Sequence, residues 1–532
     1  MPMHPITLTQ LFKLPDALSK ALVSSVKVLQ HNDETANKTV SRVTSDSRDV
    51  KPGAVFVALS GSKRDGHQFV EQAVKQGAIA VVVSSEKENY VRPVAQSNPD
   101  ISFYSSENCY QMLAALSSNF YGNPGQQMRM IGVTGTNGKT TVTHMIEQLL
   151  INQNERVGLI GTLGHKSSAQ PADSGGDGYQ ATNLTTPMAP ALQSILYQMK
   201  NETNNAFVVM EVSSHALEQQ RVFGCDFEVA VLTNLTQDHL DYHKTMANYC
   251  EAKALLFKQL SNNTERPRTA VLNLDTDYAQ SFIEACPSWV NKVTYSIFNA
   301  SADISIQAPN YTIAGSTFTL VTPKGSKAVS LKLGGQFSVY NALAAVAAGM
   351  ALGFSLDACV DAIESIAGIR GRFELVAEQP YVLVDYAHTP DGLENVLQAA
   401  RLVTPDNGRL IAVFGCGGDR DATKRPKMAH IAEKLADILM ITSDNPRTED
   451  PQQIITDVIS GIERFDPSAM VVEVDRKLAI HQAIDMATEN DIIVIAGKGH
   501  EDYQILSTET IHFDDREVVQ SYIQQRKATL SI

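Results

Sequence analysis

A glycine-rich segment with a lysine and two threonines is the part of this chain best suited to chemistry. It follows an apolar stretch at 130–133 and consists of Gly135, Thr136, Asn137, Gly138, Lys139, Thr140 and Thr141. Backbone N–H groups of such a turn can surround phosphate oxygens, the lysine adds a cation, and a threonine hydroxyl can bind Mg²⁺. Apolar residues at helical spacing follow. The segment therefore predicts a phosphate loop between a strand and a helix, and with it ATP binding.

The segment departs from the strict GxxxxGK[ST] pattern at one position. Val133 stands where that pattern has its first glycine, and the glycines lie at 132, 135 and 138 instead. The alternative interpretation is a glycine turn that joins a strand to a helix and binds nothing. Under that alternative, Lys139 and both threonines would occur together by accident.

Two apolar runs downstream of the loop also end in polar residues. The run at 207–210 ends at Glu211, which has the position of a Walker B carboxylate that holds Mg²⁺. The run at 229–232 is followed by a dense set of polar residues from Thr233 to His243, and the alternative for these is a capped helix start with Asp238 in its first turn. By its pattern alone, Lys253 is predicted to be an ordinary exposed helix lysine.

Four apolar runs in the last third of the chain each end in residues that could bind a ligand. The run at 381–384 is followed by Asp385 and His388, and the run at 410–414 by Gly415, Gly417, Asp419 and Arg420. The run at 438–441 is followed by Asp444, Asn445, Pro446 and Arg447, and the run at 492–495 by Gly497, Lys498, His500 and Glu501. Carboxyl ends of parallel strands share one crevice, so these clusters should converge on one ligand that carries both charges. A dinucleotide site is disfavoured, because Arg420 stands where GxGxxG needs glycine.

Length and composition limit the class of protein. The chain has 532 residues, 43% of them hydrophobic, which gives room for roughly three or four domains. Six cysteines lack disulfide or zinc spacing, and no apolar run is typical of a signal peptide or a membrane span, so we expect a cytoplasmic protein with no membrane span. The net charge of −14 argues against nucleic acid as a partner and favours small molecules.

The order of strand-like and helix-like segments predicts an α/β protein with three domains. Residues 1–126 form the first and close in a turn-rich hinge at 121–125. Residues 127–368 form the second, which opens with the phosphate loop and alternates strands with helices. Within it, the Gly-, Ser- and Asp-rich stretch at 164–183 is predicted to be a mobile insertion. Residues 369–532 form the third.

Taken in order, these motifs resemble those of the Mur ligases of peptidoglycan synthesis. The resemblance covers nearly the whole chain, through residues 135–141, 211–215, 234–243, 335–341, 371–374, 385–390, 415–421, 444–447 and 497–504. It implies an N-terminal UDP-binding α/β domain, a central P-loop ATPase α/β domain and a C-terminal Rossmann-like α/β domain that receives an amino acid. More narrowly, the residues at 444–447 resemble the motif of the branch that adds meso-diaminopimelate, and the lysine-adding branch lacks this arginine.

The resemblance also implies roles for individual residues. ATP would contact Gly135, Thr136, Asn137, Gly138, Lys139, Thr140, Thr141, Asn341, Arg372 and Asp385. The substrate UDP-MurNAc-L-Ala-D-Glu would contact Ser45, Ser47, Ser62, Lys63, Arg64, Thr185, Thr186, Ser213, Gln219 and Arg221. Diaminopimelate would contact Arg420, Asp444, Asn445, Pro446, Arg447, Gly497 and Glu501. The catalytic residues would be Lys139, Glu211, His239 and Lys253, and Mg²⁺ would be held by Thr140, Glu211, His239 and Lys253 as a carbamate.

For Lys253 the resemblance replaces the exposed lysine that the pattern alone predicts. Some family members have Asn directly before the threonine pair, whereas this chain has Leu184 there and Asn183 one step earlier.

The implied function is an ATP-dependent amide ligase, expected to be a monomer, that works through an acyl phosphate. Two alternatives stay open. A folylpolyglutamate synthetase or another amino-acid-adding ligase of the same fold would share the phosphate loop but has no reason to carry the 444–447 motif. A nucleotide-controlled binding protein without ligase activity would keep the loop but need not keep Glu211, His239 and Lys253 together.

Overall fold

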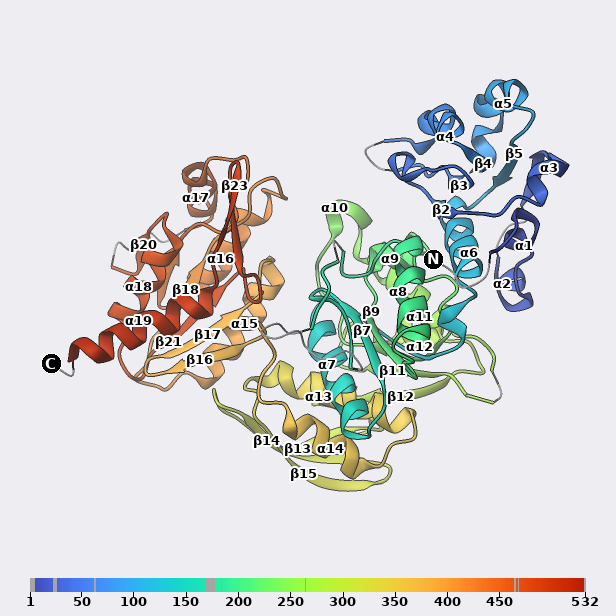
Figure 1. Ribbon diagram of the computed structural model, residues 1–532. Helices are drawn as coiled ribbons and strands as arrows, with labels where there is room; N and C mark the ends of the chain where they lie inside the picture. Colours follow the sequence, from blue (N-terminus) through green and yellow to red (C-terminus); the bar gives the residue numbers. More distant parts are fainter. Residues whose placement is uncertain are drawn as a thin grey trace.

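The computed structural model describes residues 5–22, 26–61, 64–168, 178–182, 184–263, 265–463, 466 and 468–530. Its main sheets have five, seven and six strands and come from three consecutive stretches of the chain, which Figure 1 shows as blue, teal-to-yellow and orange-to-red parts. This arrangement confirms the predicted α/β class. Within the described ranges, no helix combines the length and the apolar character needed to cross a membrane.

The first stretch builds a sheet ordered β1-β5-β4-β3-β2, in which β1 runs antiparallel to β5 and the other strands pair in parallel. Helices α4 and α5 cover one face, and α1 and α6 cover the other. The strands are β1 (Lys27–Gln30), β2 (Arg42–Thr44), β3 (Ala54–Val57), β4 (Ala78–Ser84) and β5 (Ser102–Ser106). The helices are α1 (Leu8–Phe12), α2 (Asp16–Ala21), α3 (Asp33–Ala36), α4 (Val70–Lys75), α5 (Glu88–Ser97) and α6 (Cys109–Phe120), with 3₁₀ turns η1 (Ser47–Asp49), η2 (Gly66–Phe69), η3 (Ser85–Lys87) and η4 (Pro124–Gln126).

The second stretch builds a sheet ordered β12-β11-β10-β6-β9-β7-β8, in which β8 alone of these strands pairs antiparallel. The strands are β6 (Arg129–Thr134), β7 (Val157–Gly161), β8 (Gly164–Ser167), β9 (Phe207–Glu211), β10 (Phe227–Leu232), β11 (Thr269–Asn273) and β12 (Asn291–Tyr295). Because β8 pairs with β7, the predicted mobile insertion is wrong for its first residues. Residues 169–177 and 183 of that insertion lie outside the described residues.

Helices cover both faces of this central sheet. One face carries α7 (Lys139–Asn152), α13 (Gln336–Ala351) and α14 (Leu356–Ser365), together with an antiparallel sheet of β13 (Ser305–Tyr311), β14 (Ser316–Thr322) and β15 (Gly325–Leu331). The other carries α8 (Ala189–Asn201), α9 (Ser214–Glu218), α11 (Met246–Lys258) and α12 (Ala279–Ala285), and α10 (Leu240–His243) precedes α11.

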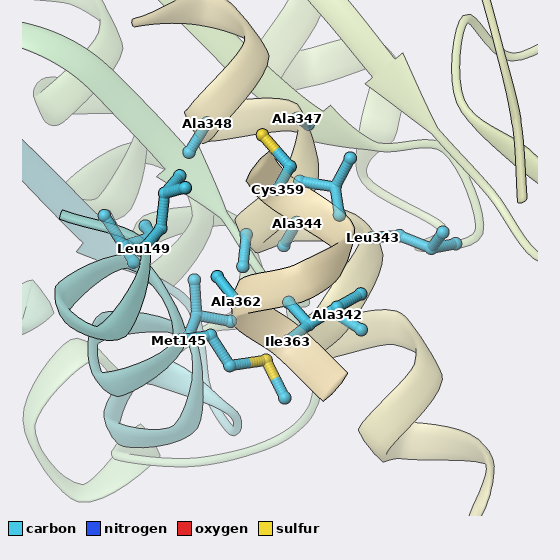
Figure 2. Packing of buried hydrophobic residues seen from close by; sticks show 14 of the residues in the cluster. Met145, Leu149, Ala342, Leu343, Ala344, Ala347, Ala348, Cys359, Ala362 and Ile363 are labelled. Atoms are coloured by element: carbon cyan, nitrogen blue, oxygen red, sulfur yellow. The ribbon is translucent and has the colours of Figure 1, made fainter. Parts of the chain in front are cut away.

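Small side chains let α13 lie close to its neighbours. Figure 2 shows Ala344, Ala347 and Ala348 near Leu149 of α7 and Cys359 of α14. At Gly349 an added Cβ would lie 2.4 Å from Leu149 Cδ2 and 2.7 Å from Cys359 Sγ. The alanine-rich helix α13 is therefore buried in the core.

The third stretch builds a sheet ordered β16-β17-β21-β18-β19-β20, in which β16 pairs antiparallel with β17 and the other strands pair in parallel. Its strands are β16 (Glu374–Glu378), β17 (Tyr381–Asp385), β18 (Leu410–Phe414), β19 (Ile438–Ile441), β20 (Met470–Val472) and β21 (Ile492–Ala496), followed by a hairpin of β22 (Tyr503–Leu506) and β23 (Glu509–His512). Helices α15 (Pro390–Val403), α16 (Lys424–Leu435) and α17 (Pro451–Ile459) cover one face, and α18 (Arg476–Met486) and α19 (Asp515–Leu530) cover the other.

Replacing Leu149 by alanine tests this account of the central core. Leu149 is 2% exposed between α13 and α14, so Leu149→Ala should lower the free energy of unfolding by about 2–5 kcal/mol, because it removes buried methyl groups and leaves a cavity. Urea unfolding measures this loss. Ile151→Ala is the matched control, since Ile151 lies on the same helix and is 39% exposed. Equal losses from the two variants would contradict the packing described here.

Candidate functional site

The predicted phosphate loop lies between β6 and the first residue of α7. Gly135 has φ 146° and Gly138 has φ 83°, conformations that L side chains rarely adopt. An added Cβ at Gly135 would lie 1.8 Å from Thr233 Oγ1, and one at Gly138 would lie 2.3 Å from Asn341 Oδ1. Both glycines are therefore required by close approach, and Asn341 of α13 packs against the loop with which the sequence associated it.

Residues after β10 hold the loop in place. The Asn137 N–H donates to Asn234 Oδ1 at 2.9 Å, and Thr233 Oγ1 donates to the Asn137 carbonyl at 2.6 Å. Thr136 Oγ1 donates to the carbonyl of Thr236 at 3.1 Å. The polar residues that follow Leu232 thus support the phosphate loop, which explains part of their density.

Two lysines donate to one backbone carbonyl of the loop. Lys139 Nζ donates to Gly135 O at 3.0 Å and to Thr136 O at 2.8 Å, and Lys253 Nζ donates to Gly135 O at 2.8 Å. Lys253 is 1% exposed, so the prediction from its pattern alone, an exposed helix lysine, is wrong. Burial lowers the pKa of Lys253 well below its ordinary value, and the nearby charge of Lys139 lowers it further.

The carboxylate of Glu211 lies under the start of α7. Glu211 is 1% exposed and accepts hydrogen bonds from Thr140 Oγ1 at 2.9 Å and from the N–H and hydroxyl of Thr162, each at 3.0 Å. An added Cβ at Gly161 would lie 2.3 Å from Glu211 Oε1, so glycine makes room for the carboxylate. Sequence reasoning missed Thr162. Its position directly after the end of β7 is the signal that could have found it.

The oxygen atoms of Glu211 and Thr140 are suitable ligands for Mg²⁺. That cation prefers oxygen ligands, and here a buried carboxylate meets a threonine hydroxyl. Among the residues that the structure describes, no group of three or more His, Cys, Asp and Glu side chains is placed to hold a metal. The site would thus depend on other oxygen donors as well. Lys253 has no oxygen to offer, and as an ammonium group it has no lone pair, whereas its carbamate would supply an oxygen ligand.

His239, the other predicted metal ligand, is the residue directly before α10. Its Nε2 is 3.3 Å from Asp238 Oδ2, and its ring contacts those of His215 and Tyr249 at centroid distances of 4.9 and 6.1 Å. Its side chain is 46% exposed. Burial lowers the pKa of His239, and the charges of Lys139 and Lys253 act in the same direction. His239 therefore borders the loop, and its role as a metal ligand stays a prediction.

The residues predicted for the peptide arm form one network beside Glu211. Thr186 Oγ1 donates to the Glu211 carbonyl at 2.9 Å and accepts from the Ser213 N–H at 3.0 Å. Arg221 donates to the Thr186 carbonyl at 2.8 Å and to Gln219 Oε1 at 2.7 Å. Thr185 Oγ1 lies 3.2 Å from Thr162 Oγ1. All five predicted residues are brought together: Thr185, Thr186, Ser213, Gln219 and Arg221.

The residues predicted for uridine lie at the carboxyl edge of the first sheet. Ser45 follows β2, and Ser47 begins η1 and is buried. Arg64 is exposed, and its carbonyl accepts from the Gly61 N–H at 3.1 Å. Ser62 and Lys63 lie outside the described residues. Contact of this loop with uridine stays a prediction.

Arg372 connects the third stretch of chain to the phosphate loop. Its Nη2 donates to Thr140 Oγ1 at 3.1 Å, and its guanidinium lies 4.7 Å from the ring centroid of Tyr386. Asp385 fixes the backbone on either side by accepting from the N–H groups of Phe373 at 2.7 Å and Ala387 at 2.8 Å. Burial raises the pKa of Asp385, although the Arg372 charge opposes this. The two predicted ATP contacts are thus brought to the loop or directly behind it.

Further contacts at this junction were not predicted. Asp391 at the start of α15 accepts hydrogen bonds from Asn137 Nδ2 at 2.5 Å and Thr236 Oγ1 at 2.7 Å. The Tyr386 ring lies 4.7 Å from that of His500, which directly precedes Glu501. A continuous line of contacts therefore runs from Thr140 through Arg372, Tyr386 and His500 toward the end of β21.

The four clusters of the third sheet converge as predicted, because β17, β21, β18 and β19 are parallel neighbours. Lys498 Nζ lies 3.3 Å from Asp444 Oδ1 and donates to Asn445 Oδ1 at 3.0 Å. Asn445 Nδ2 in turn donates to Glu501 Oε2 at 2.9 Å. The Lys498 side chain is 0% exposed, so a buried cation underlies two carboxylates. The sequence placed Lys498 in this cluster without giving it a role.

We call Asp444, Asn445, Arg447, Lys498 and Glu501 the acceptor cluster. Its two carboxylates, Asp444 and Glu501, have pKa values that are shifted in opposite directions. Burial alone would raise the pKa of Asp444, but the charges of Lys498 and Arg476 outweigh burial and hold it below its usual value. Burial and the Asp444 charge raise the pKa of Glu501. Asp444 Oδ1 is buried, and its partner in the protein is the Lys498 ammonium group at 3.3 Å, a contact that leaves a lone pair of the oxygen unused. It therefore has acceptor capacity left for the ammonium group of a ligand.

Arg447 is held at the mouth of the acceptor cluster in a left-handed conformation, φ 53°. Its N–H donates to the Ile505 carbonyl at 3.2 Å, and its Nη1 donates to the Gly418 carbonyl at 2.9 Å. An added Cβ at Gly417 would lie 2.9 Å from Arg447 Nη1. A non-glycine residue in this conformation costs about 1–3 kcal/mol, so surrounding contacts must hold it there. The remaining predicted residues, Arg420, Pro446 and Gly497, lie on the same loops, with Arg420 exposed.

Comparisons with known proteins agree with this arrangement. Three family models match: "Mur ligase family, catalytic domain" at residues 39–121, "Mur ligase middle domain" at 133–349 and "Mur ligase, glutamate ligase domain" at 371–499. The chain is 45% identical to the UDP-N-acetylmuramoyl-L-alanyl-D-glutamate--2,6-diaminopimelate ligase of Geobacillus thermodenitrificans, over 92% of this chain and 96% of that one. It is also 45% identical to the ligase of that name from Bacillus cereus, over 92% and 95%. A solved structure of a ligase of that name is 34% identical, with a TM-score of 0.67, and covers 98% of this chain and 100% of its own.

Adding one methyl group at Gly161 tests the geometry around Glu211. The new Cβ would lie 2.3 Å from Glu211 Oε1 and displace the carboxylate from Thr140. A hydrogen bond to a charged group contributes about 1.5–3 kcal/mol, so Gly161→Ala should weaken Mg²⁺–ATP binding by roughly 10- to 150-fold. Calorimetric titration measures the Kd. Gly368→Ala is the control, because nothing lies within 4 Å of its added Cβ. A Kd within twofold of wild type for Gly161→Ala would show that Glu211 does not support the site.

Proposed function

The chain belongs to the Mur ligase family, and we propose that it joins meso-diaminopimelate to the D-glutamate γ-carboxylate of UDP-MurNAc-L-Ala-D-Glu, using ATP, in peptidoglycan synthesis. The relatives that carry this activity in their names match the chain over more than nine tenths of its length. The observation that carries the proposal is the acceptor cluster, which combines a buried carboxylate, a second carboxylate and an arginine at one sheet edge.

A ligase of this kind must first activate a carboxylate, because a carboxylate does not react with an amine in water. The γ-phosphoryl group of ATP would pass to the D-glutamate γ-carboxylate, giving an acyl phosphate and ADP. Lys139 would contact the transferred phosphoryl group, and Arg372, which already reaches Thr140, would face it from the other side. Both cations offset negative charge that spreads over the phosphoryl oxygens during transfer.

Thr140, Glu211, His239 and Lys253 as a carbamate would hold Mg²⁺, which supplies further charge neutralisation at the phosphates when bound. Lys253 suits the modification, because burial lowers its pKa and so favours the unprotonated amine that adds CO₂. That addition forms an N–C bond, gives a carbamate anion and releases one proton. The anion would face Lys139 across the Gly135 carbonyl.

The acceptor cluster would then bind diaminopimelate and orient its amine. Asp444 and Glu501 would accept hydrogen bonds from ammonium groups of diaminopimelate, and Arg447 would bind its distal carboxylate through two parallel N–H donors. The attacking amino group first loses a proton to water, and the free amine then adds to the acyl carbon. The tetrahedral intermediate collapses with cleavage of the bond to phosphate, phosphate leaves, and the nitrogen releases a second proton as the amide forms. Contacts of Asp391 and Arg372 with the phosphate loop would bring the two sites together and limit hydrolysis of the acyl phosphate by water.

Release of phosphate by the purified protein tests this function. With ATP, Mg²⁺ and UDP-MurNAc-L-Ala-D-Glu present, phosphate release should require an amino acid and should be far faster with meso-diaminopimelate than with L-lysine. Equal rates with the two acceptors would contradict the assigned acceptor. Turnover with a pteroyl-glutamate substrate in place of the UDP-sugar would favour the folylpolyglutamate synthetase alternative.

Arg447→Ala tests the assigned specificity. Truncating one partner of a buried charge pair costs about 2–5 kcal/mol, so kcat/KM for meso-diaminopimelate should fall roughly 30-fold to several thousand-fold. L-Lysine should not gain comparable activity, because deleting an arginine does not build a lysine site. Initial rates at subsaturating acceptor measure both. Arg526→Ala, on α19 with 39% of its side chain exposed, is the control and should leave kcat/KM unchanged. An Arg447→Ala enzyme with wild-type kcat/KM would remove Arg447 from the acceptor site.

Lys253→Ala tests the carbamate. The variant should lose most ligase activity, and added bicarbonate should not restore it, because no amine remains to be modified. Lys258→Ala on the same helix is the control, since the Lys258 side chain is 43% exposed, and it should keep wild-type rates. An active Lys253→Ala enzyme, together with an unmodified amine at Lys253 in the wild-type protein, would restore the ordinary-lysine interpretation.

A further inference from the structure

A wholly buried arginine lies directly beneath the acceptor cluster. Arg476 is the first residue of α18 and is 1% exposed. Its Nε and Nη2 donate to the two carboxylate oxygens of Asp515, the first residue of α19, each at 2.8 Å. Both side chains of this pair are 0% exposed. Helices α18 and α19 lie side by side in Figure 1, so the pair joins two helices on one face of the third sheet.

The other donors of Arg476 reach two strand ends. Nη1 donates to the Ser443 carbonyl at 3.2 Å, and Nη2 donates to the Ala496 carbonyl at 3.1 Å. Ser443 directly precedes Asp444, and Ala496 directly precedes Gly497. The guanidinium therefore holds the backbone immediately before two segments of the acceptor cluster.

The two strand ends that Arg476 joins are not neighbours in the sheet. β18 lies between β19 and β21, so no ladder of backbone hydrogen bonds joins their carboxyl ends directly, and the ladders through β18 end before Ser443. Above β18, the loops close on each other: an added Cβ at Gly415 would lie 2.3 Å from the Thr442 carbonyl, and one at Gly497 would lie 3.6 Å from Asp444 Oδ2. A planar group with donors in a fixed fork can set such a spacing, whereas a lysine ammonium cannot.

We propose that Arg476, oriented by Asp515, is a positioning residue for the amino-acid acceptor: it sets the distance between the Asp444 and Gly497 loops and thereby the fit of meso-diaminopimelate. This inference rests on the proposed function. Asp515 neutralises Arg476 in the interior and fixes the plane of the guanidinium. An arginine that merely fastened α18 to α19 would need Asp515 but would not need the carbonyls of Ser443 and Ala496.

Arg476→Lys separates these roles, because it keeps the positive charge and removes the fork. The KM for meso-diaminopimelate should rise at least tenfold, while the KM values for ATP and UDP-MurNAc-L-Ala-D-Glu stay within twofold of wild type. Asp515→Glu is the second variant. It keeps the ion pair and moves the guanidinium by one methylene length, so it should raise the same KM in the same selective way. Thermal melting establishes that each variant is folded at the assay temperature.

Arg268→Lys is the matched control. Arg268 is also buried, at 2% exposure, pairs with Asp226 and donates to the carbonyl of Arg266 at 2.8 Å. It directly precedes β11 of the central sheet, whereas the acceptor cluster lies on the third sheet. The Arg268→Lys variant should have a lower Tm than wild type, and all three of its KM values should stay within twofold of wild type. An Arg476→Lys or Asp515→Glu enzyme whose acceptor KM is unchanged, or whose three KM values rise together, would overturn the proposal. Wild-type protein that does not use meso-diaminopimelate would instead count against the proposed function.

Discussion

Hydrogen bonds to the buried carboxylate of Glu211 hold together the part of the molecule around the phosphate loop. A charged carboxylate inside a protein is costly unless hydrogen bonds replace its water, and here Thr140 and Thr162 provide three donors. These donors come from α7 and from the end of β7, while Glu211 itself ends β9. The carboxylate thereby ties the phosphate loop to two neighbouring strands. The peptide-arm network begins at the same place, because Thr186 donates to the carbonyl of Glu211.

A second constraint is the distance between chemistry on the central sheet and chemistry on the third sheet. Under the proposed function, an acyl phosphate made at one sheet and an amine bound at the other would react only if the two edges faced each other without intervening water. Arg372 contributes to both sides, since it donates to Thr140 and lies over the Tyr386 ring, which in turn contacts His500 beside Glu501. Asp391 adds a second contact to the loop through Asn137 and Thr236. The junction is therefore part of the site.

Strand ends made most of the site predictable from sequence. Glu211 ends an apolar run of the central sheet, and Asp385, Asp444 and Glu501 follow apolar runs of the third sheet. Parallel strands bring their carboxyl ends to one edge of a sheet, so the convergence of the last three residues follows from the fold class. Lys253 was not predictable from its pattern, because helix α11 looks amphipathic only weakly and burial of a lysine depends on the Gly135 carbonyl across the fold. The role of Arg476 could not be predicted from sequence, because its hydrogen-bond partners Ser443, Ala496 and Asp515 are distant in sequence. The prediction of a mobile insertion at 164–183 was wrong for its first residues, because the composition is that of a linker although these residues pair with β7.

We propose that ATP activates the D-glutamate carboxylate as an acyl phosphate before the amine attacks. Transfer of oxygen tests this most directly, since the oxygen that joins carbon to phosphorus leaves with phosphate when the amide forms. UDP-MurNAc-L-Ala-D-Glu labelled with ¹⁸O in the γ-carboxylate should give inorganic phosphate that carries one ¹⁸O atom for each diaminopimelate joined, as measured by mass spectrometry. Phosphate without ¹⁸O, released at the same rate as the amide product, would contradict the account.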